Sequence, residues 1–196
     1  MVSKEQLIIE FAAEKFTQLG SKRFTMDDLA TQLGISKKTL YSFFRSKEEL
    51  VLESIKWLIN EYKVSLNRIL STEQDPLSCI VLIYKNAFDY IEHFKPSFIF
   101  GLRKYYPSAA KFFDDFRHEL VYEIVLELLQ KAKDLNILKK EVNPKLVCDL
   151  YFKRIESVAF KSKSLFDTYS KQELLNHLII FNLRGLARVN YVNPHF

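Results

Sequence analysis

Residues 25–50 constrain the fold most, because they hold two short helical patterns separated by a single glycine. Thr25 and Asp28 have the spacing of a helix N-cap and the acidic third residue of a capping box. Apolar residues then recur at helical spacing until Gly34, and a glycine just past a helix end adopts positive φ without a Cβ clash. Ser36 can cap the next helix. The stretch therefore predicts a helix, a sharp turn and a second helix.

The second of these helices has an apolar side and a basic, hydrogen-bonding side. This division suits a recognition helix, which packs its inner face on the preceding helix while its N-terminal residues reach base edges in the major groove. The candidate DNA-binding residues are Thr25, Lys37, Lys38, Thr39, Tyr41, Ser42 and Lys47. We expect Lys37, Lys38 and Thr39 to reach base edges. Thr25, Tyr41 and Lys47 are expected to contact phosphates.

The charge of the chain agrees with an anionic partner such as DNA. The formal net charge is +5, and four cations fall within eleven residues: Lys37, Lys38, Arg45 and Lys47. Basic runs are also common on ordinary solvated surfaces, so this run alone would say little. The capped helices and the glycine turn around it are what favour DNA binding.

The motif GISKKTLYSFFRSKEEL resembles the helix-turn-helix signature of the tetracycline-repressor (TetR) family of bacterial transcription factors. The resemblance rests on the Gly-Ile-Ser turn at 34–36, the Leu-Tyr pair at 40–41, the aromatic pair at 43–44 and the Ser-Lys-Glu-Glu-Leu segment at 46–50. Lys38 and Phe43 stand where family members often carry glycine and histidine, so no operator sequence is carried over. The resemblance implies an effector pocket among the middle helices and a dimerising four-helix bundle formed by the last two.

Composition extends the helical prediction to the whole chain. Among 196 residues there are only 4 glycines and 5 prolines, with 48% hydrophobic and 27% charged residues, which is typical of a globular protein of helices joined by short turns. We predict an all-α protein of about nine helices. Residues 1–46 should form the helix-turn-helix DNA-binding domain, and residues 47–196 the helical effector-binding and dimerisation domain.

Helical periodicity and capping signals set the expected boundaries outside the turn. The expected helices span about residues 4–19, 47–70, 77–94, 108–135, 144–164 and 171–189, with a short aromatic-rich segment at 97–106. Asn136 is expected to end its helix in a left-handed conformation. Gly185 lies inside the last helix, where it marks either a close backbone approach or a tolerated glycine. The resemblance favours the first reading, because it maps 144–164 and 171–189 to the dimerising helices.

The sequence shows no catalytic, metal or cofactor constellation. Two pairs have metal-ligand spacing on a helix, Asp115 with His118 and Glu173 with His177, but isolated pairs are more often solvated contacts. Cys79 and Cys148 lie in apolar helical patterns and read as buried free thiols of a reducing cytoplasm. No apolar run approaches the about 20 residues needed to cross a bilayer. We expect a cytoplasmic protein that is not an enzyme and needs no cofactor.

Aromatic residues of the larger domain are either core or lining of an apolar effector cavity. They are Trp57, Tyr62, Tyr84, Phe88, Phe98, Phe100, Tyr105, Phe112, Phe113 and Phe116. We predict a homodimeric, sequence-specific DNA-binding repressor that recognises an inverted-repeat operator and is released by a small, mostly apolar or aromatic effector. The alternative is a helical binding or enzyme module in which the helix-turn-helix-like segment serves only packing.

Overall fold

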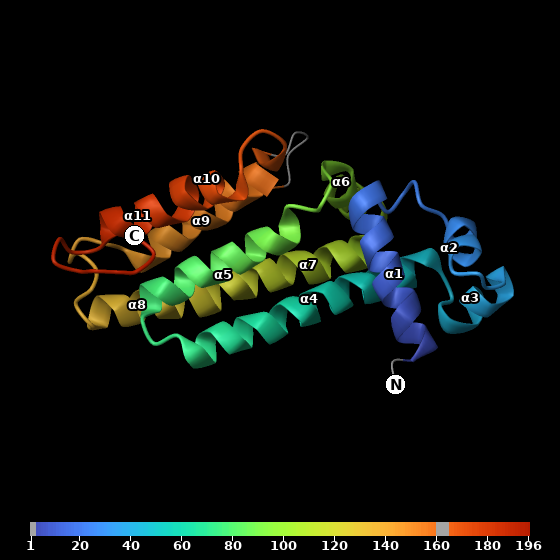
Figure 1. The fold of residues 1–196 in the computed structure, drawn as a ribbon, viewed down its shortest axis with the longest axis horizontal. Helices are drawn as coiled ribbons and strands as arrows, with labels where there is room; N and C mark the ends of the chain where they lie inside the picture. Colours follow the sequence, from blue (N-terminus) through green and yellow to red (C-terminus); the bar gives the residue numbers. More distant parts are fainter. Residues whose placement is uncertain (1–2, 160–164) are drawn as a thin grey trace. The chain divides into compact units, whose positions relative to one another are not determined.

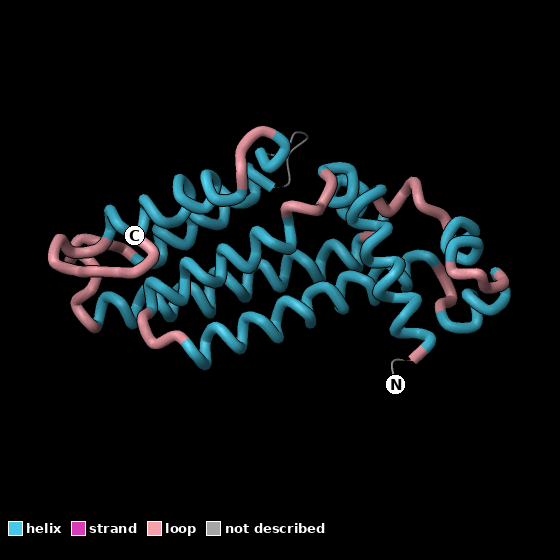
Figure 2. Tube along the Cα trace, in the orientation of Figure 1, coloured by secondary structure: helices cyan, strands magenta, loops and turns pink. Residues whose placement is uncertain are grey.

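The computed structural model describes residues 3–159 and 165–196, and within them helices are joined by loops and no strand occurs (Figure 2). Counting each continuous helical run once, this part of the chain holds nine helices and one 3-10 turn. The all-α prediction is confirmed. None of the described helices is long and apolar enough to span a bilayer.

The chain divides into two compact units. The first comprises Met1–Glu61 with His93–Asp115, and the second comprises Tyr62–Glu92 with Phe116–Phe196. Helix α4, which runs unbroken from Lys47 to Thr72, supplies residues to both units, as the continuous helix in Figure 1 shows. The expected boundary after residue 46 separates DNA binding from effector binding and dimerisation, and it remains a prediction.

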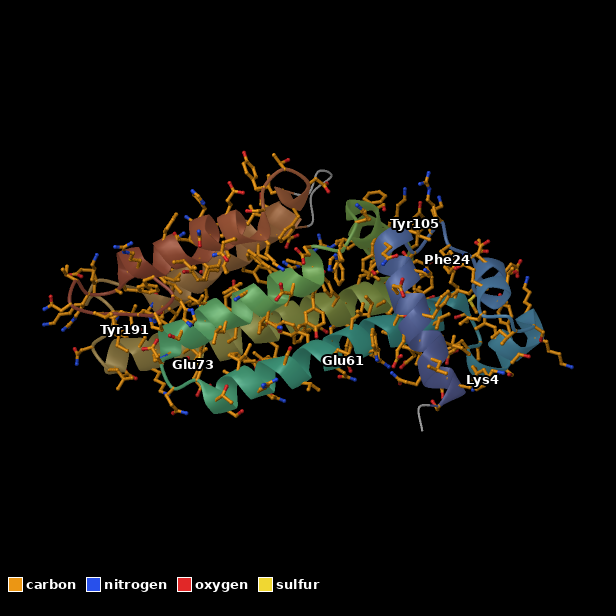
Figure 3. The ribbon with its side chains drawn as sticks, in the orientation of Figure 1. Lys4, Phe24, Glu61, Glu73, Tyr105 and Tyr191 are labelled. Atoms are coloured by element: carbon orange, nitrogen blue, oxygen red, sulfur yellow. The ribbon has the colours of Figure 1, made fainter. Side chains whose placement is uncertain are left out.

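The first unit contains the three N-terminal helices and a later helix that packs on them. Its elements include α1 (Lys4–Leu19), α2 (Met26–Gln32), α3 (Lys37–Phe43) and α6 (Pro96–Tyr105). The Ser3 hydroxyl accepts a hydrogen bond from the Gln6 backbone N–H at 3.0 Å and so caps α1. Phe24, between α1 and α2, is buried and packs edge-on against Phe16, with ring centroids 6.5 Å apart (Phe24 is labelled in Figure 3).

Small residues bring α6 close to the end of α1. A Cβ built on Gly20, whose φ is +87°, would lie 3.1 Å from the Ser97 Oγ, and one built on Gly101 would lie 3.0 Å from the Ser21 Oγ. The short aromatic-rich segment is thus a helix packed on α1. Only small side chains fit where the two helices meet.

The second unit is built around α5 (Pro76–Ile91), which is buried on most sides. A long helical run crosses from the first unit into the second as α7 (Pro107–Glu119), the π-helix η1 (Leu120–Val125) and α8 (Leu126–Asp134). Asn136 then adopts φ +58°. The Asn136 N–H donates to the Lys133 carbonyl at 3.0 Å and the Ile137 N–H to the Ala132 carbonyl at 2.9 Å, so the predicted left-handed cap is confirmed.

The last helices follow the loop after Asn136. They are α9 (Pro144–Ala159), the 3-10 turn η2 (Leu165–Asp167), α10 (Lys171–Leu175), the π-helix η3 (Asn176–Ile180) and α11 (Phe181–Leu186). The start of α9 is confirmed, since the Asn143 side chain accepts from the N–H groups of Lys145 and Leu146. Its predicted end near Ser164 lies outside the described residues.

The predicted end of the last helix at Val189 is wrong by three residues. The Leu186 carbonyl accepts from the Lys139 N–H at 3.0 Å, and the Arg188 N–H donates to the Ile137 carbonyl at 2.9 Å. These bonds form an isolated antiparallel bridge between Leu138 and Ala187. Pairing with a distant loop therefore draws the chain out of the helix, although the apolar pattern continues.

The C-terminal segment also caps the central helix. The Tyr191 hydroxyl, in the residue labelled in Figure 3, donates to Asp75 Oδ1 at 2.6 Å. The Asn193 side-chain amide donates to the same oxygen and to the Ser78 hydroxyl, both at 3.0 Å. Because Asp75 is the N-cap of α5, the end of the chain holds the start of α5 in place.

Candidate nucleic-acid interface

The turn between α2 and α3 has the geometry that the glycine predicted. Gly34 adopts φ +63°, its N–H donates to the Thr31 carbonyl at 3.1 Å, and the Ile35 N–H donates to the Ala30 carbonyl at 3.0 Å. This pair of bonds is a Schellman motif, which satisfies carbonyls at the end of α2. The chain is thereby redirected within two residues into the Ser36 cap of α3.

The N-terminus of α2 is closed by a reciprocal capping box. The Thr25 hydroxyl accepts from the Asp28 N–H at 3.1 Å, and the Asp28 carboxylate accepts from the Thr25 N–H at 2.8 Å and from its hydroxyl at 2.7 Å. These bonds to the ionised form lower the pKa of Asp28. The Thr25 hydroxyl is thus engaged within its own helix, beside a carboxylate, and a phosphate contact would have to share it.

The three residues predicted to contact base edges, at the start of α3, differ in whether their side chains already have a partner within the chain. Lys37 is exposed and forms an ion pair with Asp27, at 2.8 Å from Nζ to Oδ1, and this pairing raises the pKa of Lys37. Lys38 is exposed and has no side-chain partner in the described part of the chain. The Thr39 hydroxyl lies 2.8 Å from that of Ser36, which caps the helix. Lys38 is therefore the most available of the three.

The two predicted contacts further along α3 also differ. The Tyr41 side chain is 42% exposed, so its hydroxyl can reach a neighbouring molecule. Ser42 is exposed too, but its hydroxyl donates to the Thr39 carbonyl at 2.7 Å. This bond within its own helix uses the O–H group that would otherwise donate a hydrogen bond to a phosphate oxygen.

Lys47 is less exposed than predicted. Its ammonium lies 5.8 Å from the centroid of the Phe16 ring and 3.5 Å from the Lys22 carbonyl, and the side chain is half-buried. Burial lowers the pKa of Lys47. The side chain therefore joins the first turn of α4 to α1 in addition to any contact with DNA.

Two arginines that the sequence reasoning left out of the candidate set are exposed beside the helix caps. Arg23 precedes the Thr25 cap of α2, and Arg45 precedes the Ser46 cap of α4. Neither side chain has a partner in the described part of the chain. A cation one or two residues before an N-cap is the signal that could have found them, because the helix N-terminus and the cation both favour a phosphate.

The other candidate chemistry is not assembled in this structure. His177 Nδ1 lies 2.9 Å from the Glu173 backbone carbonyl, while the Glu173 carboxylate belongs to the Ser170 capping box. The His118 ring stacks on Tyr122 with centroids 4.4 Å apart. Among the described residues, no three histidine, cysteine or acidic side chains come together as a metal site would require.

The cysteines and half of the ten aromatic candidates are buried. Both thiols are free, as predicted, and burial raises the pKa of Cys148 to about 11. Three aromatics depart from the expectation of core or cavity lining: Phe100 is 63% exposed, and Tyr105 and Phe112 are partly exposed. The Lys104 ammonium lies over the rings of Phe100 and Tyr105, so these two exposed aromatics make cation–π contacts at the surface.

Comparison with known proteins agrees with this geometry. The family described as "Bacterial regulatory proteins, tetR family" matches residues 8–54. The HTH-type transcriptional regulator YvaF of Bacillus subtilis is 30% identical over 178 residues, which are 89% of this chain and 93% of that protein. The HTH-type transcriptional repressor KstR2 of Mycolicibacterium smegmatis is 33% identical over 95 residues, or 46% of this chain and 44% of its own length.

Solved structures share the fold over nearly the whole chain. FadR of Bacillus subtilis, in complex with stearoyl-CoA, has a TM-score of 0.74 at 15% identity and covers 93% of this chain and 100% of its own. A transcriptional regulator from Cytophaga hutchinsonii has a TM-score of 0.72 at 23% identity, covering 94% and 99%. The family match and the sequence relatives, rather than the shared fold, support a DNA-binding regulator over a helical module in which the turn serves only packing. The chain belongs to the TetR family of DNA-binding transcriptional regulators.

Proposed function

We propose that the chain acts as a homodimeric repressor in the cytoplasm, and that the start of α3 reads its operator. The exposed Lys38 beside the Ser36 cap carries this proposal, because it is a free cation on the first turn of the helix that enters the groove. Lys37 and Thr39 would complete the base contacts. Tyr41, Thr25 and the half-buried Lys47 would contact phosphates, and we add Arg23 and Arg45 to them. Ser42 would join them once its hydroxyl turns away from the Thr39 carbonyl.

The dimer would form through α9 and the run from α10 to α11. These helices lie side by side (Figure 1) and are joined by a hydrogen bond from Arg154 to Asn182 of 2.7 Å. Leu146 and Leu150, one turn apart on α9, and Phe181 on α11 are exposed apolar side chains. One turn after Phe181, a Cβ built on Gly185 would meet no atom of this chain within 4 Å. Any close backbone approach at Gly185 would therefore come from a second molecule. The two helix-turn-helix segments of the dimer would then select an inverted repeat with half-sites about 34–36 Å apart or somewhat more.

A small effector would release the operator. KstR2 is named a repressor, and the FadR structure holds stearoyl-CoA, whose long acyl chain is apolar, which supports repression relieved by a ligand with a large apolar part. The effector can shift DNA binding only by its differential affinity for the DNA-bound and free arrangements, so the operator must weaken effector binding by the same factor. Helix α4, with residues in both units, is the element through which we expect the coupling.

DNA reading is tested by fluorescence anisotropy with the upstream region of the gene and a scrambled duplex. Lys38→Ala should lose roughly ten- to hundredfold of affinity for the preferred site and little for scrambled DNA. Lys47→Met, which keeps the packed stem and removes the charge, should weaken both duplexes similarly. Equal losses on both duplexes for Lys38→Ala would refute base reading by α3. If the native chain does not prefer the upstream region over the scrambled duplex, the proposed sequence-specific regulation through that region is refuted.

The dimer surface is tested by sedimentation. Leu150→Glu and Phe181→Glu each place a charge on the proposed interface and should shift the chain towards monomer. Val64→Glu is the matched control, since Val64 is 69% exposed on α4, away from α9 and α11. Dissociation by the control to the same degree, or none by the other two, would contradict the proposed surface.

A further inference from the structure

Two buried tyrosines in the second unit have hydroxyls without a hydrogen-bond partner. Tyr84 on α5 is 3% exposed and Tyr151 on α9 is 2% exposed, and their rings meet edge-to-face with centroids 5.7 Å apart. Neither hydroxyl oxygen reaches a donor or acceptor in the described part of the chain. An unpaired buried hydroxyl is costly, and native proteins seldom carry two together without a functional reason.

The other buried tyrosines do not share this feature. The Tyr62 hydroxyl donates to the Ile83 carbonyl at 3.1 Å, and the Tyr106 hydroxyl donates to the Ser21 carbonyl at 3.3 Å. Both of these hydroxyls thus donate to a backbone carbonyl. The Tyr84 and Tyr151 pair is the exception.

Two π-helices contribute side chains to the cluster that holds this tyrosine pair. The π-helix η1 contributes Val121 and Val125, and the π-helix η3 contributes Ile179 and Ile180, to the same apolar cluster that contains both tyrosines. π-Helical turns are rare and occur frequently at functional sites. Both π-helices of the described chain thus border one cluster, the one that holds the unpaired hydroxyls.

The chemistry of the cluster selects an uncharged hydrogen-bond acceptor. Burial raises the pKa of both Tyr84 and Tyr151, so both phenols are protonated at neutral pH and act as donors. The charged side chain that is buried among the described residues, Arg117, pairs with Glu156 at 3.1 Å. A carboxylate would therefore find donors but no unpaired buried cation, whereas a carbonyl oxygen has two lone pairs for two phenols.

We propose that Tyr84 and Tyr151 form the polar end of an effector site, and that its ligand is an apolar molecule whose uncharged carbonyl oxygen accepts hydrogen bonds from both hydroxyls. The inference rests on the proposed effector response and names the chemical class of the effector. The side chains of α5, α9 and the two π-helices supply the apolar surround.

The test uses probes that differ only at the polar group. Binding of 2-acetylnaphthalene, 2-ethylnaphthalene and 2-naphthoate to the full chain is measured by calorimetry, in the absence of DNA. The ketone should bind about tenfold more tightly than the ethyl compound for each hydroxyl it engages. Tyr84→Phe and Tyr151→Phe should each reduce this preference about tenfold. Tyr62→Phe, which removes a hydroxyl that already has a partner, should leave it unchanged.

A second measurement separates a lost contact from a damaged fold. Without ligand, Tyr84→Phe and Tyr151→Phe should keep or raise the melting temperature, because each removes an unpaired polar atom. Tyr62→Phe should lower it, because a satisfied bond to Ile83 is lost. A lowered melting temperature for both of the first two variants would show that their hydroxyls are satisfied in solution, and would overturn the site.

Other outcomes also overturn the proposal. They are equal binding of the ketone and the ethyl compound, tighter binding of the naphthoate, no ketone binding up to its solubility, and an undiminished preference in both phenylalanine variants. DNA binding is measured separately, so these failures leave the DNA-reading proposal standing. Conversely, loss of operator preference with intact ketone selectivity would remove the regulatory role and retain the site.

Discussion

Replacing Gly34 by alanine isolates the energetic role of the turn that places α3. Gly34 has φ +63°, and a Cβ built there meets no atom within 4 Å. The substitution therefore adds backbone strain without a steric clash, and holding an L-residue in the left-handed region costs about 1–2 kcal/mol. For a chain of this size, about 1 kcal/mol shifts the melting temperature by about 2–4 °C. We expect Gly34→Ala to lower the melting temperature by about 2–8 °C.

Three matched variants separate strain from other effects. Gly34→Asn should recover much of the loss, because asparagine tolerates the left-handed conformation. Gly20→Ala should cost more than Gly34→Ala, because it combines φ +87° with a Ser97 Oγ contact at 3.1 Å. Gly185→Ala should be neutral or raise stability by up to about 1 kcal/mol, since its Cβ is unobstructed within the chain and alanine favours a helix.

The assay is urea and thermal denaturation at one fixed protein concentration, because a dimer couples stability to concentration. From most to least stable, the expected order of the variants is Gly185→Ala, Gly34→Asn, Gly34→Ala and Gly20→Ala. If Gly34→Ala costs no more than Gly185→Ala, or Gly34→Asn costs as much as Gly34→Ala, the left-handed turn is not what glycine supplies. A loss confined to Gly185→Ala that grows on dilution would instead locate backbone approach at the dimer interface.

Three further predictions follow from individual contacts. Asp27→Asn should tighten binding to both specific and scrambled DNA, measured by anisotropy, because it releases Lys37 and removes a negative charge; unchanged affinity would contradict the competition. Cys148, with its pKa raised to about 11 by burial, should stay unreactive to a thiol reagent at pH 8 and react in urea; fast native labelling would show that the thiol is accessible. Asn193→Ala should lower the melting temperature by destabilising the start of α5, and no change would show that the C-terminal segment does not hold that cap.

The features predicted correctly from the sequence are those decided within three or four residues. The box of Thr25 with Asp28 forms as expected, and Ser170 with Glu173 forms the same kind of box, because cap and partner are on the same turn of helix. Gly34 and Asn136 end their helices by the same local rule, in which one residue must adopt positive φ. A reader of the sequence needs no tertiary information for these.

The features that were missed depend on contacts distant in sequence. Leu186 ends α11 because its carbonyl accepts from Lys139, and the apolar pattern through Val189 carries no trace of that bond. Both π-helices lie within uninterrupted helical patterns, since one extra residue in a turn leaves capping signals and composition unchanged. Phe100 has the spacing of a core residue and yet lies at the surface, with the Lys104 ammonium over its ring.

The same distinction applies to charge at the candidate interface. Four cations in residues 37–47 suggest four cationic contacts with DNA for each protomer, but Lys37 is paired with Asp27 and Lys47 rests on Phe16. Lys38 and Arg45 have no partner in the described part of the chain. Because each neutralised phosphate adds about 0.9 to the slope of log affinity against log salt, a count of free cations implies a shallower slope than a count of residues. Any cation that DNA must first detach contributes its charge only after its protein contact has been broken.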